Sequence, residues 1–245
     1  DVPYQVIGNG SNLLVGDRGI RGLVIEMLSK EDEICVEDDC ITVGAGMLLS
    51  KTANRAAEHG LTGMEFAAGI PGRIGGAVVM NAGAYGGEMK DILTAVTVLD
   101  QEGNEKILSA EELELGYRTS CILKKGYIVT GAKIKLKHGE ETAIRARMEE
   151  LKKQRVEKQP LEYPSAGSTF KRPEGYFAGK LIMDAGLRGY LVGEAQVSEK
   201  HCGFVINRGN ATAADVRTLM QNVADIVEEK FGVRLEPEVK MIGEF

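Results

Sequence analysis

The sequence has little of several residues on which specialised proteins depend. Its 245 residues include no Trp, 3 His, 4 Cys and 6 Pro, and aromatic residues make up 5% of the chain. The four cysteines are scattered and form no Cys-x-x-Cys pair, so their spacing supports neither a metal site nor a disulfide framework. No apolar run approaches the roughly 20 residues of a membrane helix. These absences predict a globular protein with reduced thiols, no metal and no membrane insertion.

The net charge and the chain length narrow the class of protein further. The 36 Asp and Glu residues outnumber the 30 Lys and Arg residues, giving a net charge of −6, which argues against a nucleic-acid partner. The sequence opens without a basic segment followed by an apolar one, so we expect no secretory signal and a cytoplasmic location. With 43% hydrophobic residues, a chain of this length predicts one large domain or two to three small ones.

Hydrophobic periodicity predicts a mixed arrangement of helices and strands. A helix starting at Leu49 should end at Gly60, and another should begin at Thr212 and close at Gly232. Ser109 and Glu112 match a capping box. Strands are expected at 2–7 (buried), 23–27, 34–36, 41–43, 92–99, 128–136 and 204–207, further helices at 142–159 and 177–185, a polar loop at 164–173, and six core residues at Val216, Leu219, Met220, Val223, Val227 and Phe231.

Two loops rich in Gly and Asn stand out. The first, residues 8–12, follows a predicted strand, but Leu13 occupies the position of the third Gly of a dinucleotide fingerprint, which excludes the Rossmann motif. The second, residues 69–76, places Pro71 at a helix start. Exposed backbone N–H groups at such places suit a pyrophosphate, and residues 81–86 would allow close approach to a flat ring system. Taken alone, each loop could equally be a tight turn.

Together with three further motifs, these loops resemble the MurB family of flavoenzymes. The likeness covers essentially the whole chain. Its motifs are Gly-Asn-Gly-Ser-Asn-Leu-Leu-Val at 8–15, Ala-Gly-Ile-Pro-Gly-Arg-Ile-Gly-Gly-Ala at 68–77, Gly-Tyr-Arg at 116–118, Gly-Ser-Thr-Phe-Lys-Arg-Pro at 167–173 and Pro-Glu-Val at 237–239. The resemblance implies an α+β fold: an FAD-binding fold of the vanillyl-alcohol-oxidase type plus a C-terminal α+β substrate-binding subdomain.

The family's activity implies a bacterial cytoplasmic oxidoreductase of peptidoglycan precursor synthesis. With FAD as cofactor and NADPH as reductant, it would convert UDP-N-acetylglucosamine enolpyruvate, a UDP-sugar, to UDP-N-acetylmuramate. Hydride would pass from flavin N5 to C3 of the enolpyruvyl group, and a proton would reach C2. We expect a monomer, and a single site that NADPH and substrate occupy by turns.

The resemblance also assigns roles to residues of this sequence. Ser168 would donate the proton, while Arg118 and Glu238 would polarise the substrate carboxylate, on which negative charge accumulates. Residues expected to bind FAD are Gly8, Asn9, Gly10, Ser11, Asn12, Leu13, Gly69, Ile70, Pro71, Gly72, Gly75, Gly76, Asn81, Gly83 and Tyr117, and those expected to bind substrate are Lys158, Lys171, Arg172, Lys180 and Lys200.

The family pattern further implies three subdomains. Residues 1–22, completed by 233–245, would be the remnant of an N-terminal FAD-binding subdomain, 23–154 the central FAD-binding subdomain, and 155–232 the substrate-binding subdomain. Two departures are visible. Family members carry a strand, helix and strand ahead of the point that matches Asp1, so we expect a fragment or a partly recorded chain. The short turn between Leu136 and Thr142 indicates the subtype without a tyrosine lid loop.

Two alternatives remain open at this stage. A flavin-dependent alcohol oxidase of the same fold would use O2 as oxidant, but it would not need the set of Arg118, Ser168 and Glu238, because alcohol oxidation requires no proton donor to an enolate. A catalytically silent fragment that binds a UDP-sugar without FAD is the second alternative, and the missing N-terminal portion is its support.

Overall fold

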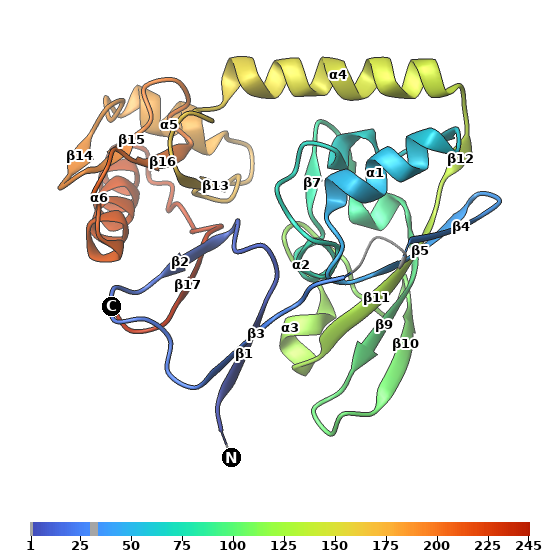
Figure 1. Cartoon of the computed structure of the whole chain (residues 1–245). Coiled ribbons are helices and arrows are strands. Elements are labelled where there is room, and N and C mark those ends of the chain that lie inside the picture. The colour runs from blue at the N-terminus through green and yellow to red at the C-terminus, as the bar shows by residue number, and fades with distance from the viewer. Residues whose placement is uncertain (1, 30–33) are drawn as a thin grey trace. The chain divides into compact units, whose positions relative to one another are not determined.

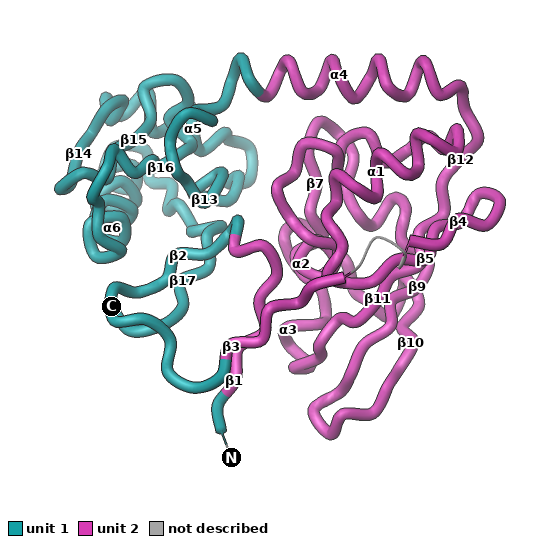
Figure 2. The backbone as a smooth tube through the Cα atoms, in the orientation of Figure 1, with its two compact units in different colours: residues 1–3, 11–23, 156–245 teal, residues 4–10, 24–155 magenta. Residues whose placement is uncertain are grey.

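The computed structural model describes residues 2–29 and 34–245 and divides them into two compact units (Figures 1 and 2). Residues 1 and 30–33, which fall within the first and second predicted subdomains, lie outside the described residues. Unit 1 takes its described residues from 1–3, 11–23 and 156–245, and unit 2 takes its own from 4–10 and 24–155. Each unit has its own hydrophobic core.

Unit 2 is built on a five-stranded antiparallel sheet with the order β10-β9-β11-β5-β4 (Figure 1). The strands are β4 (Ile34–Glu37), β5 (Cys40–Gly44), β9 (Leu93–Leu99), β10 (Glu105–Ser109) and β11 (Ile128–Lys135). Val96 and Val98 of β9 alternate with more exposed neighbours, as expected for a sheet with one buried face. The predicted strands at these positions are confirmed.

Helices and short strands complete unit 2. The helix α1 (Leu49–Glu58) buries a stripe of small residues and ends before Gly60, which takes the positive φ of 63° that glycine tolerates. The predicted end of this helix is confirmed. The remaining elements are α2 (Ile74–Val79), α3 (Cys121–Lys125), α4 (Glu141–Lys158), β6 (Leu61–Thr62) paired with β12 (Lys137–His138), β7 (Gly83–Ala84) paired with β8 (Gly87–Glu88), and the 3-10 turns Glu65–Ala67 and Met89–Asp91.

Unit 1 holds a four-stranded sheet, two helices and a parallel strand pair. The sheet has the order β13-β16-β15-β14, with β13 (Ser165–Ser168), β14 (Leu191–Val192), β15 (Ala195–Val197) and β16 (Phe204–Asn207). The helices are α5 (Ala178–Asp184) and α6 (Ala213–Phe231). Near the chain ends, β2 (Leu13–Val15) runs parallel to β17 (Lys240–Ile242), with Leu13 opposite Lys240.

The caps predicted for α6 are confirmed. Thr212 accepts a hydrogen bond from the backbone N–H of Asp215, the Asp215 carboxylate accepts one from the N–H of Thr212, and Gly232 ends the helix at a φ of 68°. Four of the six predicted core residues are buried, and Val216 is half-buried. Phe231 is 40% exposed, so its prediction as core is wrong: the last turn of the helix extends past the sheet it packs on.

Two other local predictions are wrong. β1 (Tyr4–Ile7) pairs with β3 (Leu23–Glu26) in a two-stranded sheet, and Val2 and Tyr4 are 71% and 52% exposed rather than buried. The predicted loop at 164–173 contains β13, whose Ser-Ala-Gly-Ser sequence lacks the branched residues typical of strands. The capping box predicted for Ser109 and Glu112 is confirmed by its two reciprocal hydrogen bonds, and the residues that follow form a turn.

Candidate active site

The two Gly-rich loops predicted to hold FAD meet in unit 2. The side-chain amide of Asn9 donates a hydrogen bond to the backbone carbonyl oxygen of Pro71 at 2.8 Å. A Cβ placed on Gly8 would lie 3.6 Å from the Cβ of Arg73. Segments more than sixty residues apart therefore lie side by side, as a shared ligand site requires.

Open space borders both loops. A Cβ on Gly10 or on Gly76 would meet no heavy atom within 4 Å, so a ligand could approach either backbone closely. Gly75 instead packs against the chain itself. Its N–H donates to the carbonyl of Ala45, and its Cβ position lies 3.1 Å from the Ala45 Cβ. The glycine pattern thus fits a phosphate-bearing cofactor at Gly10 and Gly76, and close packing at Gly75.

Other members of the second loop turn their N–H groups inward. The N–H of Ile70 donates to the carbonyl of Ala67, and that of Gly72 donates to the carbonyl of Ile70. These two bonds hold the loop in the shape that precedes α2. Pro71 has no N–H, and its carbonyl is occupied by Asn9, so its contribution is to join the loops.

Sequence reasoning missed Arg73, a member of the second loop whose side chain packs against Gly8 of the first. Its guanidinium donates to the carbonyl of Gly46 at 2.6 Å and lies 3.7 Å from Glu26. Its Nε is buried, and within the described residues it has no hydrogen-bond partner. Arginines are common on surfaces, so the sequence offered no signal that this one would be mostly buried against Gly8.

Arg118, a predicted catalytic residue, sits at the centre of a tight turn in unit 2. Gly116 and Thr119 exchange backbone hydrogen bonds at 3.1 and 3.3 Å, and Arg118 adopts a positive φ of 54°. Its guanidinium donates to the carbonyl of Gly83 at 3.2 Å and lies 5.0 Å from the ring centroid of Tyr117. The Gly-Tyr-Arg motif is therefore next to the segment 81–86 that was expected to approach the flavin ring.

Ser168 and Glu238 come together in unit 1. Ser168 is exposed at the end of β13, after Gly167 with its φ of 84°, and its hydroxyl donates to the carbonyl of Phe170 at 3.3 Å. The backbone N–H of Glu238 donates to the carbonyl of Thr169 at 2.9 Å. Glu238 is only 9% exposed. Two predicted catalytic residues thus lie on neighbouring extended segments, and the carboxylate is withdrawn from water.

The first predicted FAD loop contributes its second half to the same unit. The side-chain amide of Asn12 donates to the carbonyl of Glu238 at 3.2 Å, and the N–H of Lys240 donates to the carbonyl of Asn12. Ser11 lies in the turn before β2, and Leu13 is the first residue of that strand. These bonds and the β2–β17 pair therefore fix the backbone of Glu238, which lies two residues before β17.

Two of the predicted substrate residues follow Ser168 directly. The backbone N–H of Lys171 donates to the carbonyl of Glu236, and its ammonium group lies 3.0 Å from the Glu236 carboxylate. The Arg172 guanidinium lies 4.0 Å from the ring centroid of Phe177 and donates to the carbonyl of Tyr176. Both cations are thus held near the serine.

The remaining predicted substrate residues are more dispersed. Lys180 pairs with Asp184 one turn along α5 at 2.7 Å, which is a common surface arrangement. Lys200 donates to the carbonyl of Val156 at 2.8 Å, and Lys158 is exposed at the C-terminal end of α4. Lys200 therefore contacts the same end of α4 that carries Lys158, whereas Lys180 belongs to a helix face.

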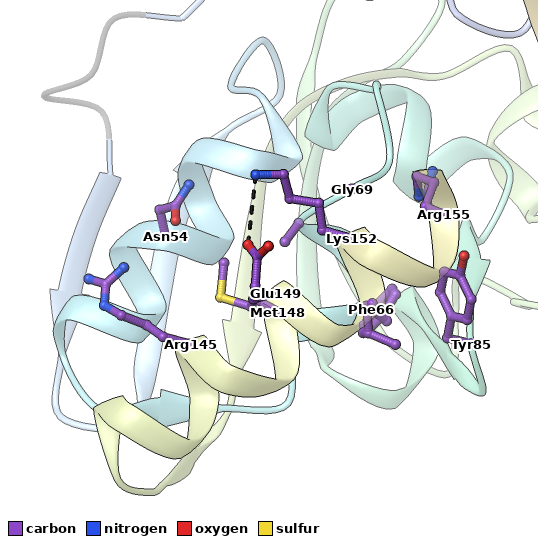
Figure 3. A pocket seen from close by; sticks show the side chains of 11 residues that line it. Asn54, Phe66, Gly69, Tyr85, Arg145, Met148, Glu149, Lys152 and Arg155 are labelled. Atoms are coloured by element: carbon purple, nitrogen blue, oxygen red, sulfur yellow. Dashed lines mark ion pairs between the residues drawn. The ribbon is translucent and has the colours of Figure 1, made fainter. Parts of the chain in front are cut away.

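A pocket of about 460 Å³ lies within unit 2, between α4 and the α1 side of the unit (Figure 3). Its lining includes Gly69 and none of the other residues predicted to bind FAD, all of which are among the described residues. At one end, Arg155 lies 5.7 Å from the ring centroid of Tyr85. Burial lowers the pKa of this guanidinium, and Tyr85 opposes the shift. Arg155 also occupies the space that a Cβ on Gly69 would need, so this glycine allows α4 to approach the loop.

Comparison with known proteins gives a family match for each of two parts of the chain. Residues 1–109 match the family described as FAD binding domain, and residues 159–242 match the UDP-N-acetylenolpyruvoylglucosamine reductase C-terminal domain. The chain is 62% identical to a UDP-N-acetylenolpyruvoylglucosamine reductase of Agathobacter rectalis, over all of this chain and 82% of that protein. It is 60% identical to the protein of the same description from Lachnoclostridium phytofermentans, over 80% of its length.

A solved structure extends the similarity to the fold. The UDP-N-acetylenolpyruvylglucosamine reductase of Thermus caldophilus matches with a TM-score of 0.85 and 42% identity, covering 99% of this chain and 86% of that one. The predicted α+β fold with an FAD-binding domain is confirmed. None of the helices in the described ranges is both long enough and apolar enough to cross a membrane.

Proposed function

The chain belongs to the UDP-N-acetylenolpyruvoylglucosamine reductase family, and from this premise we propose how its residues carry out the reaction. The activity is that of an NADPH-dependent FAD reductase, which converts UDP-N-acetylglucosamine enolpyruvate to UDP-N-acetylmuramate for peptidoglycan synthesis. The relatives favour this activity over an alcohol oxidase or a silent sugar-binding fragment, because proteins that match over the whole of this chain are named as reductases.

Reduction of the enolpyruvyl double bond requires one hydride and one proton. When bound, FAD supplies the hydride, which originates from NADPH and adds to C3 of the enolpyruvyl group. Negative charge then accumulates on the adjacent carboxylate, and C2 becomes a strong base. The protein must therefore stabilise an anion and deliver a proton to one carbon.

Ser168 is the proposed proton donor to C2. Its hydroxyl is exposed at the end of β13, where a substrate can reach it and where water can return the proton afterwards. A serine hydroxyl is a weak acid, so the transfer depends on the high basicity of the enolate. General acid catalysis of this kind typically accelerates a step by about 10²- to 10⁴-fold.

Arg118 and Glu238 are the proposed partners of the substrate carboxylate. A guanidinium offers the planar, charged donor that suits a carboxylate. Glu238 is nearly buried, and its backbone is bound to Thr169, the residue after Ser168. This backbone contact is the single observation that carries the proposal, because it couples the position of the acid to that of the serine.

Binding roles follow the same logic. We propose that Gly10 and Gly76 face the FAD diphosphate across the open space beside them, and that Lys158, Lys171, Arg172 and Lys200 serve the substrate diphosphate and uridine. Lys180 is the weakest of the set, since it pairs with Asp184 one turn along the same helix, whereas Lys171 and Arg172 follow Ser168 directly.

The subdomain division, the oligomeric state and the cellular location are further proposals that rest on the sequence. The division into 1–22 with 233–245, 23–154 and 155–232 is supported by the pairing of β2 with β17, which joins the two ends of the first group. We also propose a monomer and a bacterial cytoplasmic location; the four free cysteines support the location, because they suit a reducing compartment.

An anaerobic visible spectrum tests the proposed function. The purified chain is reconstituted with FAD, then mixed with NADPH and afterwards with UDP-N-acetylglucosamine enolpyruvate. Bleaching of the flavin by NADPH, followed by recovery of the oxidised spectrum with the enolpyruvyl substrate, is the expected trace. Recovery with O2 alone would support the oxidase, and failure to retain flavin would support the silent fragment.

A further inference from the structure

We propose that Asn81 is a positioning residue for Arg118, fixing the Gly116–Thr119 turn through its side-chain amide. The inference rests on the proposed role of Arg118. It differs from the expectation drawn from the sequence, in which Asn81 contacts FAD.

The Asn81 side chain is fully buried and its amide is engaged on both sides. Its Nδ2 donates to the Glu88 carboxylate at 2.9 Å and to the carbonyl of Gly116 at 3.0 Å, while its Oδ1 accepts from the N–H of Lys90 at 2.9 Å. An amide nitrogen has two hydrogens, and both are used. A cofactor could accept a hydrogen bond from this amide nitrogen only by displacing one of these bonds.

The bond to Gly116 acts where two residues other than glycine have positive φ angles. Arg118 has a φ of 54° and Asn81 a φ of 44°, both in the left-handed region that residues with a Cβ disfavour. Such conformations persist where surrounding contacts determine them, and they concentrate at functional sites. The Gly116 carbonyl opens the turn that carries Arg118, so its partner helps to set the direction in which Arg118 leaves the turn.

Two further bonds join the same segments. The Ser120 hydroxyl donates to the carbonyl of Val79 at 2.7 Å, and the Arg118 guanidinium donates to the carbonyl of Gly83. Asn81 lies between these two carbonyl positions. Segments 79–83 and 116–120 are thus joined at three points, and among these Asn81 is the side chain that holds the turn itself.

The charge of Glu88 allows a sharp test. In Asn81→Asp, two oxygens would face the Glu88 carboxylate and the Gly116 carbonyl where a donor now lies. In the double variant Asn81→Asp with Glu88→Gln, the new amide at position 88 can donate to the new carboxylate at position 81, so the contact between the two positions returns. The Gly116 carbonyl still lacks its donor. The double variant therefore separates folding of the 79–90 segment from positioning of the turn.

The experiment measures the two half-reactions of the FAD-loaded enzyme in an anaerobic stopped-flow instrument. For the double variant, we expect reduction by NADPH to change by less than about twofold and reoxidation by UDP-N-acetylglucosamine enolpyruvate to slow by about tenfold or more. Asn81→Gly, which removes the three bonds without adding charge and accepts a positive φ, should give the same ratio. Using both variants keeps the test decisive if one of them folds poorly.

Two further variants serve as controls and decide how the result is interpreted. Thr52→Val removes a buried hydrogen bond of α1, to the Leu48 carbonyl, and should lower stability without changing the ratio of the half-reactions. Arg118→Lys should slow reoxidation as the double variant does. If Arg118→Lys slows reoxidation while both Asn81 variants reoxidise normally, or slow both steps equally, the positioning role is overturned. If Arg118→Lys itself reoxidises normally, the proposed role of Arg118 fails and the inference fails with it.

Discussion

The side-chain amide of Asn12 donates a hydrogen bond to the backbone carbonyl oxygen of Glu238, 226 residues further along the chain. One residue later, β2 begins its parallel pairing with β17. The bond therefore locks the strand pair at the end where the proposed acid lies. The Gly-Asn-Gly-Ser-Asn motif, which the sequence predicts to be a cofactor loop, therefore also holds the backbone of the proposed catalytic residue Glu238.

Removing this bond should affect the second half-reaction. In Asn12→Ala, the Glu238 carbonyl loses a donor, and we expect a loss of about 1 kcal/mol in the free energy of unfolding. Because Glu238 would be less well held, reoxidation by the enolpyruvyl substrate should slow more than reduction by NADPH. Asn222→Ala, which removes a bond to the Tyr190 hydroxyl in the same unit, is the matched control. An unchanged ratio of the half-reactions in Asn12→Ala would contradict the coupling.

Loss of the Ser168 hydroxyl should leave flavin reduction intact. Ser168→Ala should still be bleached by NADPH but reoxidise about 10²- to 10⁴-fold more slowly with the enolpyruvyl substrate, since general acid catalysis is lost. Rapid-mixing absorbance of the flavin checks both steps. Ser165→Ala, in the same strand, provides the control, and unimpaired reoxidation of Ser168→Ala would exclude this serine as the donor.

Neutralising Glu238 should also act on the second step. Glu238→Gln keeps the size of the side chain and the backbone bond to Thr169, so the fold should persist. The amide cannot act as the acid that polarises the substrate carboxylate, so substrate reoxidation should slow more than NADPH reduction. Equal rates in both steps, compared with wild type, would leave Glu238 a structural role only.

The sequence predicts the regular elements well because their signals are local. The burial stripe of α1, the cap at Thr212 and the glycines at the helix ends each depend on neighbours within a few residues. β13 was missed because Ser, Ala and Gly have low strand propensity, and its pairing with β16 overrides this. The exposure of β1 depends on what covers its sheet, which no local pattern specifies.

In the candidate site, too, the residues with local motifs could be predicted and those that depend on long-range contacts could not. The motifs containing Ser168, Arg118 and Glu238 could be identified from a family resemblance, although composition and periodicity alone would not have singled out Glu238. The bond from Asn81 to Gly116 spans 35 residues and depends on backbone angles that the sequence does not display. Supporting residues of this kind emerge only when the hydrogen-bond partners are known.

The open face at Gly76 allows a test of cofactor binding that is separate from folding. In Gly76→Ala, the methyl group meets no heavy atom of the chain, and alanine favours a helix over glycine by about 1 kcal/mol, so stability should not fall. FAD affinity should nevertheless drop by about tenfold or more, because the methyl group enters the ligand's space. Fluorescence titration of the apoprotein measures this. Gly75→Ala, which crowds Ala45, should instead lower the melting temperature, and unchanged FAD affinity in Gly76→Ala would refute the assignment.

Acid should weaken the β9–β10 hairpin through Asp100. Lys106 and the backbone N–H of Asn104 lower the pKa of this carboxyl group below its ordinary value of about 4. A carboxyl group with a lowered pKa in the folded state stabilises the protein above about pH 4, and this stability is lost as the pH falls through the folded-state pKa. The difference in urea midpoint between wild type and Asp100→Asn should therefore be present at pH 7 and shrink in strong acid. A difference that does not vary with pH would contradict this.

The parallel pairing of β2 with β17 also orders events during synthesis. Leu13 is synthesised more than two hundred residues before its partner Lys240. The sheet of unit 2 draws its strands from residues 34–135, so it can assemble while the remainder of the chain is still being translated. We expect Ser168 and Glu238 to meet only after residues 236–238 have been made, because their segments are joined through these residues. A nascent chain would thus form the five-stranded sheet of unit 2 well before Glu238 can join Ser168, the proposed proton donor.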